Sequence, residues 1–152
     1  MGGSVGGAVA QLVLAESGAD VRAAVLINPV VRLQDTIDGL SARFGVTYTW
    51  SGPATAFAER VDFLARADEL TGAAVLVVTG ADDDEAAILR PARELVSRLR
   101  ARGGTAEGRT VAGMGHALAE EPGLEPAPQL PRAAEVDRLA TAWFTTHLLG
   151  PR

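Results

Sequence analysis

The first residues of the chain place a serine between glycines at the entrance of a predicted helix. Gly2, Ser4 and Gly6 form the spacing G-x-S-x-G, and the run 8–16 contains good helix formers and no proline. A sharp turn that leads into a helix holds its central residue in a strained conformation with the side chain pointing outward. The helix start adds unpaired backbone N–H groups and a partial positive charge, which stabilise an anion. The pattern fits a nucleophilic serine, and it fits equally well a flexible Gly/Ser leader.

Two further polar groups follow apolar runs that are typical of strands. The acidic turn Asp82–Asp84 comes after the apolar run 73–80, and His116 comes after the weaker run 105–111. A carboxylate can orient an imidazole, and the imidazole can take the proton of a serine that attacks a carbonyl carbon. The plainer alternatives are a solvated acidic turn and a surface histidine. A calcium loop is not favoured, because its acidic ligands alternate along the chain instead of being consecutive.

Length, charge and composition limit the possible function classes. The 152 residues have the size of one domain, and 47% hydrophobic with 22% charged residues is an ordinary globular balance. A net charge of −5 leaves no basic surface for nucleic acid, and the absence of cysteine excludes disulfides and thiolate chemistry. No apolar run reaches the roughly 18 residues of a membrane span, and no secretory signal is visible. We therefore expect a single cytoplasmic domain, 1–152, with neither a nucleic-acid nor a membrane partner.

The hydrophobic pattern alternates between helical and extended segments. We expect helices over about 5–16, 33–44, 57–66, 91–102 and 132–149, strands over 23–27, 73–80 and 105–111, and a loop rich in glycine and proline over 112–131. This alternation builds a parallel sheet with helices on both faces, although three strands are few for such a sheet. Function gathers in the loops beyond the carboxyl ends of parallel strands. The serine, the acidic turn and the histidine should therefore meet at one edge of the sheet.

The segment 32–70, between the first two predicted strands, is longer than a simple crossover requires. It is consistent with an insertion of two helices that acts as a cap or lid, and equally with a plain crossover helix followed by a long loop. Tyr48, Trp50 and Phe57 lie in this segment. They would suit an apolar substrate pocket, but aromatic residues at such spacing also suit a core. The identity of the substrate stays open.

Taken together, three motifs resemble the carboxyl-terminal half of an α/β-hydrolase. They are Gly2–Gly7 around the serine, Val75–Asp84 with its strand and acidic turn, and the dipeptide Gly115-His116. The sequence resembles in particular the prolyl oligopeptidase family of S9-like serine peptidases and its dienelactone-hydrolase-like relatives. The resemblance covers nearly the whole chain. It implies an α/β fold, a three-layer α-β-α sandwich that lacks the early strands of the complete hydrolase fold.

The resemblance implies a role for each polar residue. Ser4 would be the nucleophile, and His116 would act as general base and then as general acid. The family places the acidic residue three positions after the glycine that closes the strand; counted from Gly80 this is Asp83, with its two acidic neighbours as alternatives. The backbone N–H of Val5 would supply one donor of the oxyanion hole. This mechanism needs no cofactor and no metal.

The sequence departs from the family at its start. Only one residue precedes Gly2, so the strand that feeds the serine, the early sheet and the second oxyanion donor are expected to be missing. The strand 23–27 would then expose an apolar edge, where a second copy or a partner chain could bind. We expect a serine hydrolase that cleaves a small-molecule ester or peptide through an acyl-enzyme, and whose activity could require a missing N-terminal half. The alternatives are an inactive hydrolase-derived module that associates through its open edge, and a binder of small ligands.

Overall fold

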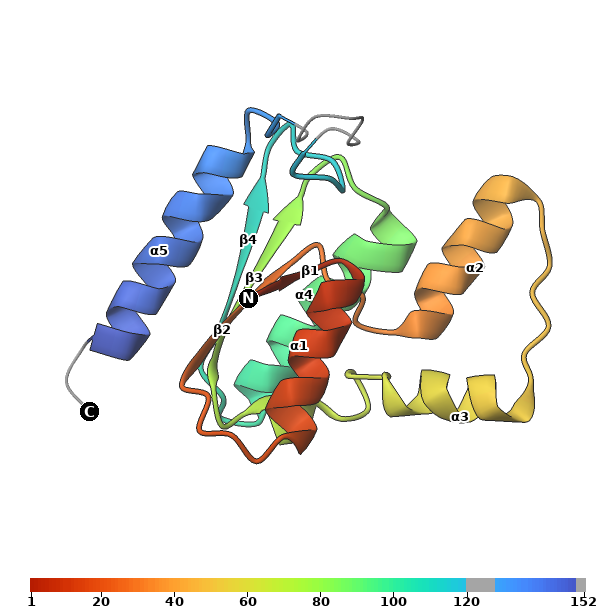
Figure 1. The fold of residues 1–152 in the computed structure, drawn as a ribbon, viewed down its shortest axis with the longest axis horizontal. Helices are drawn as coiled ribbons and strands as arrows, with labels where there is room; N and C mark the ends of the chain where they lie inside the picture. Colours follow the sequence, from red (N-terminus) through yellow and green to blue (C-terminus); the bar gives the residue numbers. More distant parts are fainter. Residues whose placement is uncertain (120–127, 150–152) are drawn as a thin grey trace.

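A parallel sheet of four strands forms the centre of the fold (Figure 1). The computed structural model describes residues 1–119 and 128–149, so part of the predicted Gly/Pro-rich loop lies outside the described residues. The strands are β1 (Gly2–Gly3), β2 (Ala23–Ile27), β3 (Ala74–Gly80) and β4 (Ala106–Val111), and they lie in this order across the sheet. This is the expected α/β fold, with one strand more than the sequence predicts.

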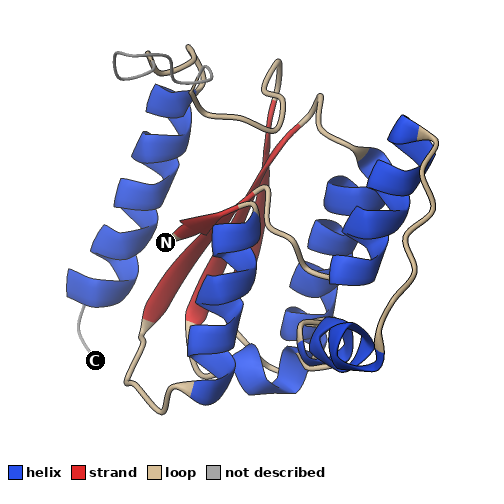
Figure 2. Ribbon diagram, turned by 45° about the vertical axis from the view of Figure 1, so that its right-hand side comes forward, coloured by secondary structure: helices blue, strands red, loops and turns tan. Residues whose placement is uncertain are grey.

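Helices cover both faces of the sheet (Figure 2). They are α1 (Val5–Glu16), α2 (Leu33–Phe44), α3 (Gly52–Arg60), α4 (Arg90–Ala101) and α5 (Ala133–Leu149), joined by a short 3₁₀ helix η1 (Ala67–Leu70) and a π-helical turn η2 (Glu85–Leu89). The helix α5 packs on one face of the sheet, and α1 and α4 pack on the other. The predicted three layers are therefore present. Within the described residues, no helix has the length and apolarity needed to cross a membrane.

The strands β2 and β3 are buried along their whole length. Val75 and Val77 of β3 pack into the core beneath α1 and α4, whereas Leu76 and Val78 pack against α5. A strand that is covered on both faces needs apolar side chains at successive positions, because neither face meets water. The structure thus confirms the prediction that these continuous apolar runs are central strands.

The strand β1 corrects two expectations from the sequence. Gly2 and Gly3 pair in parallel with Leu26 and Ile27, so a short strand does lead into the serine turn. Glycines carry none of the β-branched or aromatic side chains that mark a strand, and for this reason the sequence pattern misses it. The expected open edge at 23–27 is also wrong in part, since β1 covers the carboxyl end of β2.

The segment 32–70 differs from the prediction in its second helix, while α2 has the predicted bounds. The helix α3 begins earlier than predicted, because Ser51 Oγ accepts a hydrogen bond from the N–H of Ala54 at 3.3 Å and caps the helix start. It also ends earlier, at Arg60, so Val61 is buried beyond the helix instead of on its face. The assignment of this segment as a cap stays a prediction.

Of the aromatic residues in this segment, Phe63 is fully buried in the core, whereas Tyr48, Trp50 and Phe57 are not core residues. Tyr48 and Phe57 each expose 49% of their surface. Trp50 is half-buried and lines a small cavity together with Arg32 and Glu59. Neither the core interpretation nor a closed apolar pocket describes these three side chains.

An ion-pair network ties α3 and the following turn to the end of α1. Arg60 and Arg66 both bind the carboxylate of Glu16, and Arg66 also binds Glu69. The two guanidinium groups that hydrogen-bond to Glu16 lower the pKa of its carboxyl group to about 2. Because these groups are accessible to water, they orient α3 more than they stabilise the fold.

Candidate active site

The backbone of Ser4 is held in a strained conformation between β1 and α1. Its φ of 51° and ψ of −123° are unusual for a residue with a side chain. The N–H of Ser4 donates to the carbonyl of Ile27 at 2.9 Å, and the carbonyl of Ser4 accepts from the N–H groups of Gly7 and Val30 at 2.9 and 3.1 Å. Such strain persists only where neighbouring contacts determine the backbone, and three hydrogen bonds do so here. Residues 2–7 therefore form a strand–turn–helix unit and not a flexible leader.

Close contacts explain two of the glycines around the serine. A Cβ atom on Gly2 would lie 2.2 Å from the carbonyl oxygen of Gly6, and a Cβ atom on Gly7 would lie 2.8 Å from Pro29 Cβ. A Cβ atom on Gly6 itself would meet nothing within 4 Å. The turn is thus tight because the strand, the helix start and the loop after β2 approach each other closely.

The structure brings Ser4, His116 and Asp83 together at the carboxyl ends of the strands. His116 Nε2 lies 2.8 Å from Ser4 Oγ, and His116 Nδ1 lies 2.8 Å from Asp83 Oδ2. The carboxylate is nearly buried, with 5% of the side chain exposed, whereas the imidazole is 44% exposed. The hydrogen bond that His116 donates to Asp83 raises the pKa of His116 above its ordinary value of 6.5, against a smaller opposing effect of burial. With the Nδ1 proton held by the carboxylate, Nε2 is the atom that can accept the serine proton.

The three consecutive aspartates have different environments. Asp83 Oδ1 accepts a hydrogen bond from the N–H of Asp84 at 2.7 Å, while its other oxygen faces the imidazole. Asp84 caps η2, since its Oδ1 accepts from the N–H groups of Ala86 and Ala87 at 2.9 and 2.8 Å. Asp82 is exposed. Of the three, Asp83 is the aspartate whose carboxylate is hydrogen-bonded to the imidazole.

The predicted oxyanion donor lies beside the serine. Val5 is the first residue of α1, where backbone N–H groups have no partner within the helix. This N–H and the positive end of the helix are available to an oxygen that becomes charged near Ser4 Oγ. Within residues 1–119 and 128–149, no three histidine, aspartate or glutamate side chains lie close enough to hold a metal ion.

Asn28 is a site residue that the sequence analysis missed. It directly follows β2, and the sequence pattern assigns it with Pro29 to a simple turn. In the structure its side chain is buried and hydrogen-bonds to the backbone of Gly80, Gly115 and His116. The available signal was an amide residue at the end of a buried strand, at the same edge of the sheet as the other polar groups.

The loop that carries His116 crosses directly over the end of β3. A Cβ atom on Gly80 would lie 2.2 Å from the carbonyl oxygen of Met114 and 2.6 Å from that of Gly115. The N–H of Asp82 donates to the same Met114 carbonyl at 3.0 Å. A side chain at position 80 would therefore push the histidine loop away from the sheet.

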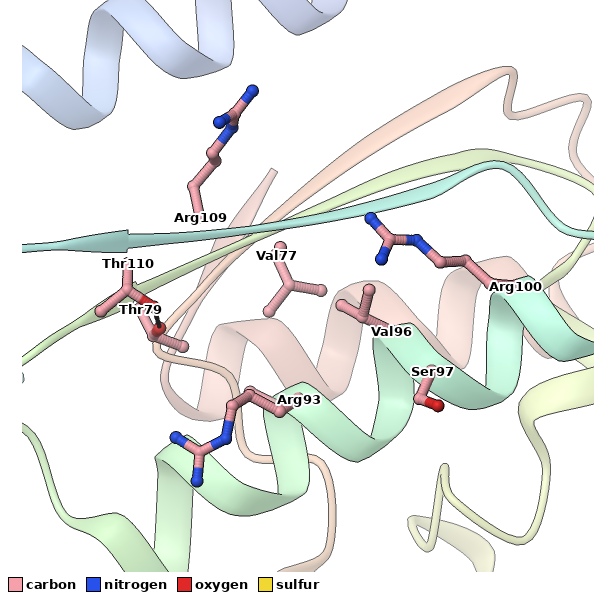
Figure 3. Close-up of a pocket in the computed structure, with 10 residues that line it drawn as sticks. Val77, Thr79, Arg93, Val96, Ser97, Arg100, Arg109 and Thr110 are labelled. Carbon is pink, nitrogen blue, oxygen red and sulfur yellow. Dashed lines mark hydrogen bonds between the residues drawn. The ribbon is translucent and has the colours of Figure 1, made fainter.

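A cavity of about 390 Å³ lies apart from these residues, between α4 and the strands β3 and β4 (Figure 3). Its lining includes Val77, Thr79, Arg93 and Arg100, and none of Ser4, Asp83 and His116. The hydroxyl groups of Thr79 and Thr110 lie 3.2 Å apart on its wall. This cavity is not continuous with the serine site, and we assign it no role in substrate binding.

Comparison with known protein families identifies the chain. A sequence model of the prolyl oligopeptidase family of peptidases matches residues 1–147. The chain belongs to this family. Serine hydrolases with an α/β-hydrolase fold are therefore its relatives, as the motifs around Ser4 and His116 predict.

Solved structures of other hydrolases share the fold of this prolyl oligopeptidase-family chain. A puromycin-hydrolysing peptidase of Mycobacterium tuberculosis is 19% identical, with a TM-score of 0.69 over 97% of this chain and 21% of that one. TT1662 of Thermus thermophilus is 21% identical, with a TM-score of 0.68 over 99% and 54% of the two chains. The carboxylesterase Cest-2923 of Lactobacillus plantarum is 19% identical, with a TM-score of 0.63 over 98% and 58%. The chain thus spans from about a fifth to little more than half of these proteins. No curated protein sequence is significantly similar to it.

Proposed function

We propose that this chain carries the catalytic triad of a serine hydrolase, with Ser4 as nucleophile, His116 as general base and acid, and Asp83 as the residue that orients the imidazole. The observation that supports this proposal most strongly is the unbroken hydrogen-bond path from Ser4 Oγ to His116 and on to Asp83, with 2.8 Å at both steps. The proposed substrate is a small ester or peptide whose carbonyl carbon can reach Ser4 Oγ.

The proposed reaction begins with acylation of the serine. As Ser4 Oγ bonds to the carbonyl carbon, its proton passes to His116 Nε2, and the charge on the imidazolium is stabilised by Asp83. The carbonyl oxygen becomes an oxyanion that the N–H of Val5 stabilises. The bond to the leaving alcohol or amine then breaks, and the imidazolium gives that group its proton. Water, deprotonated by the imidazole, hydrolyses the acyl-enzyme and regenerates the serine.

The oxyanion hole of this fold has a second donor in a loop after an early strand. We propose that polypeptide beyond residues 1–152, or a partner chain, supplies this donor, because the chain spans 54% and 58% of two hydrolase-fold structures that it matches. Loss of one oxyanion donor lowers the rate by about 10²–10³-fold. The expected activity of residues 1–152 alone is therefore low but measurable with reactive substrates.

The pH dependence of serine reactivity tests this proposal. Only neutral His116 can accept the serine proton, and its hydrogen bond to Asp83 raises its pKa. The rate of covalent labelling by a fluorophosphonate probe should therefore increase with pH, with a midpoint above 6.5. The measurement is the second-order labelling rate between pH 5 and pH 9. A rate that does not change with pH in this range would contradict the role of His116.

A second candidate function is association through α1, and an exposed apolar stripe favours it. Val5, Val9 and Val13 lie on one side of this helix with 65%, 55% and 43% of their surfaces exposed, and Met1 nearby is 73% exposed. We propose that a second copy or a partner chain covers this stripe beside β1.

Replacement of Val9 with lysine tests the association. It should shift the protein from an oligomer to a monomer in size-exclusion chromatography with light scattering, because a charge in an apolar contact is costly. Val46→Lys, at a residue that is 44% exposed on another part of the surface, is the matched control and should not change the mass. A wild-type protein that is monomeric both when purified and in lysate fractions would exclude association through α1 as a function.

A further inference from the structure

Both ends of the Asn28 side-chain amide form hydrogen bonds within the proposed site. Its Nδ2 atom donates to the carbonyl oxygens of Gly115 at 3.1 Å and of His116 at 2.8 Å. Its Oδ1 atom accepts from the N–H of Gly80 at 2.8 Å. The residue is 99% buried, with 1% of its surface exposed. An amide has two N–H donors, and both are used here for backbone carbonyls of the histidine loop.

Asn28 connects three elements that carry the proposed triad. Through the chain it is joined to Ile27, whose carbonyl holds the N–H of Ser4. Through Oδ1 it holds Gly80, from which the turn with the acidic residue begins. Through Nδ2 it holds the loop of His116. Asn28 is thus connected to all three segments, to the acidic turn and the histidine loop through its side chain and to the serine turn through its backbone.

Other backbone hydrogen bonds hold the histidine loop on either side of the histidine. After it, the N–H of Leu130 donates to the carbonyl of Leu118 at 2.9 Å. The N–H groups of Ala81 and Asp82 donate to the carbonyls of Val111 and Met114 at 2.9 and 3.0 Å. In residues 1–119 and 128–149, the hydrogen bonds to the carbonyls of the next two loop residues come from Asn28. Between these flanking contacts, the backbone that bears the imidazole is hydrogen-bonded to this amide.

We propose that Asn28 is a positioning residue of the hydrolase, which fixes the imidazole of His116 at hydrogen-bond distance from both Ser4 and Asp83. This inference rests on the proposed function. The simpler explanation is that Asn28 only makes a turn, since its φ of 42° is in the left-handed region that asparagine tolerates. A glycine would make that turn equally well, but it would lose every side-chain hydrogen bond.

The substitution Asn28→Gly separates these two roles. If Asn28 positions the loop, this variant should fold, and its His116 pKa should fall toward the ordinary value. Its labelling rate with a fluorophosphonate probe should fall by about 10²-fold, which is the effect of displacing a reacting group by about 1 Å. The pKa is measured by NMR titration of the imidazole, and folding by circular dichroism. Thr79→Val is the matched control, because Thr79 is buried on β3 beside Gly80 and hydrogen-bonds only to Thr110 among the described side chains. It should leave both the His116 pKa and the labelling rate within twofold of the wild type.

The outcomes distinguish the inference from the proposed function. An Asn28→Gly protein with the wild-type His116 pKa and labelling rate would overturn the positioning role and leave the triad proposal intact. A wild-type protein that neither labels nor shows a raised His116 pKa would overturn the triad proposal itself. If Asn28→Gly does not fold, Asn28→Asp takes its place, since it keeps the shape and the acceptor for Gly80 but replaces the donors with an oxygen. Labelling of Asn28→Asp at the wild-type rate would refute the inference.

Discussion

Replacement of Ser4 with alanine is expected to prevent formation of the acyl-enzyme and to reduce hydrolysis of an activated ester, such as p-nitrophenyl acetate, to the small residual rate that the oxyanion donor and binding alone support. The hydroxyl that His116 contacts at 2.8 Å is the only group in the proposed mechanism that bonds to the substrate. Loss of a triad nucleophile lowers kcat by about 10⁶-fold in an enzyme at full activity. The measurement is the initial rate of ester cleavage by purified wild-type and Ser4→Ala protein at pH 8.

The matched control for this prediction is Ser17→Ala. Ser17 is an exposed serine after α1, and its Oγ donates to the carbonyl of Val13 at 2.7 Å. This variant removes the same atom from the other end of the same helix and should hydrolyse the ester at the wild-type rate. Equal rates for Ser4→Ala and Ser17→Ala would mean that the cleavage does not depend on the serine turn.

The second large effect is expected from Asp83→Asn. An amide at this position keeps the shape of the side chain, but it favours the tautomer of His116 that presents a proton to Ser4, so the imidazole can no longer accept one. An equivalent change in a serine protease lowers kcat by about 10⁴-fold. The pKa of His116 should fall at the same time, because the hydrogen bond that its imidazole donates to the Asp83 carboxylate is the main reason that this pKa is raised. Ester hydrolysis and an NMR titration of the imidazole measure the two effects.

Asp82→Asn is the control for the loss of charge. Asp82 belongs to the same turn and is exposed, while the Asp83 carboxylate is nearly buried against the imidazole. Both variants remove one negative charge from the turn, so a difference between them isolates the hydrogen bond to His116. If Asp82→Asn loses as much activity as Asp83→Asn, the turn acts only through its charge and the assigned acid is wrong.

Local sequence signals were sufficient for most of the elements around the site. The runs of β2 and β3 are apolar at every position because both faces of these strands are covered, and their bounds match the prediction within one residue. The end of α2 at Gly45 follows from a glycine in the left-handed conformation, with φ 64°. The order of serine, acidic turn and histidine along an alternating pattern also predicted that they meet at one sheet edge. That prediction needs only the direction of parallel strands.

Features that depend on distant contacts could not be predicted. The pairing of β1 depends on Leu26 and Ile27, and two glycines alone give no strand signal. The end of α3 depends on the return of the chain to the core, where the N–H of Phe63 donates to the carbonyl of Val31 at 3.0 Å. The proposed role of Asn28 depends on hydrogen bonds to carbonyls 87 and 88 positions away. In each case the partner is fixed by the tertiary structure and leaves no periodic pattern in the local sequence.

The choice of Asp83 shows the limit of pattern reasoning within the site. Counting from Gly80 by the family spacing selects it, but residue type alone does not distinguish it from its neighbours. The structure distinguishes them by their hydrogen bonds, since the carboxylate of Asp84 caps the start of η2 and does not bind the imidazole. The proposed assignment of Asp83 as the acid therefore rests on both the spacing and the geometry.

The most direct test of the account is to locate a fluorophosphonate adduct on the intact protein by mass spectrometry and peptide mapping. We predict a single adduct on Ser4, and its disappearance in His116→Ala, because the hydroxyl becomes nucleophilic only when the imidazole can take its proton. An adduct on any other residue, or equal labelling of Ser4 with and without His116, would contradict the account.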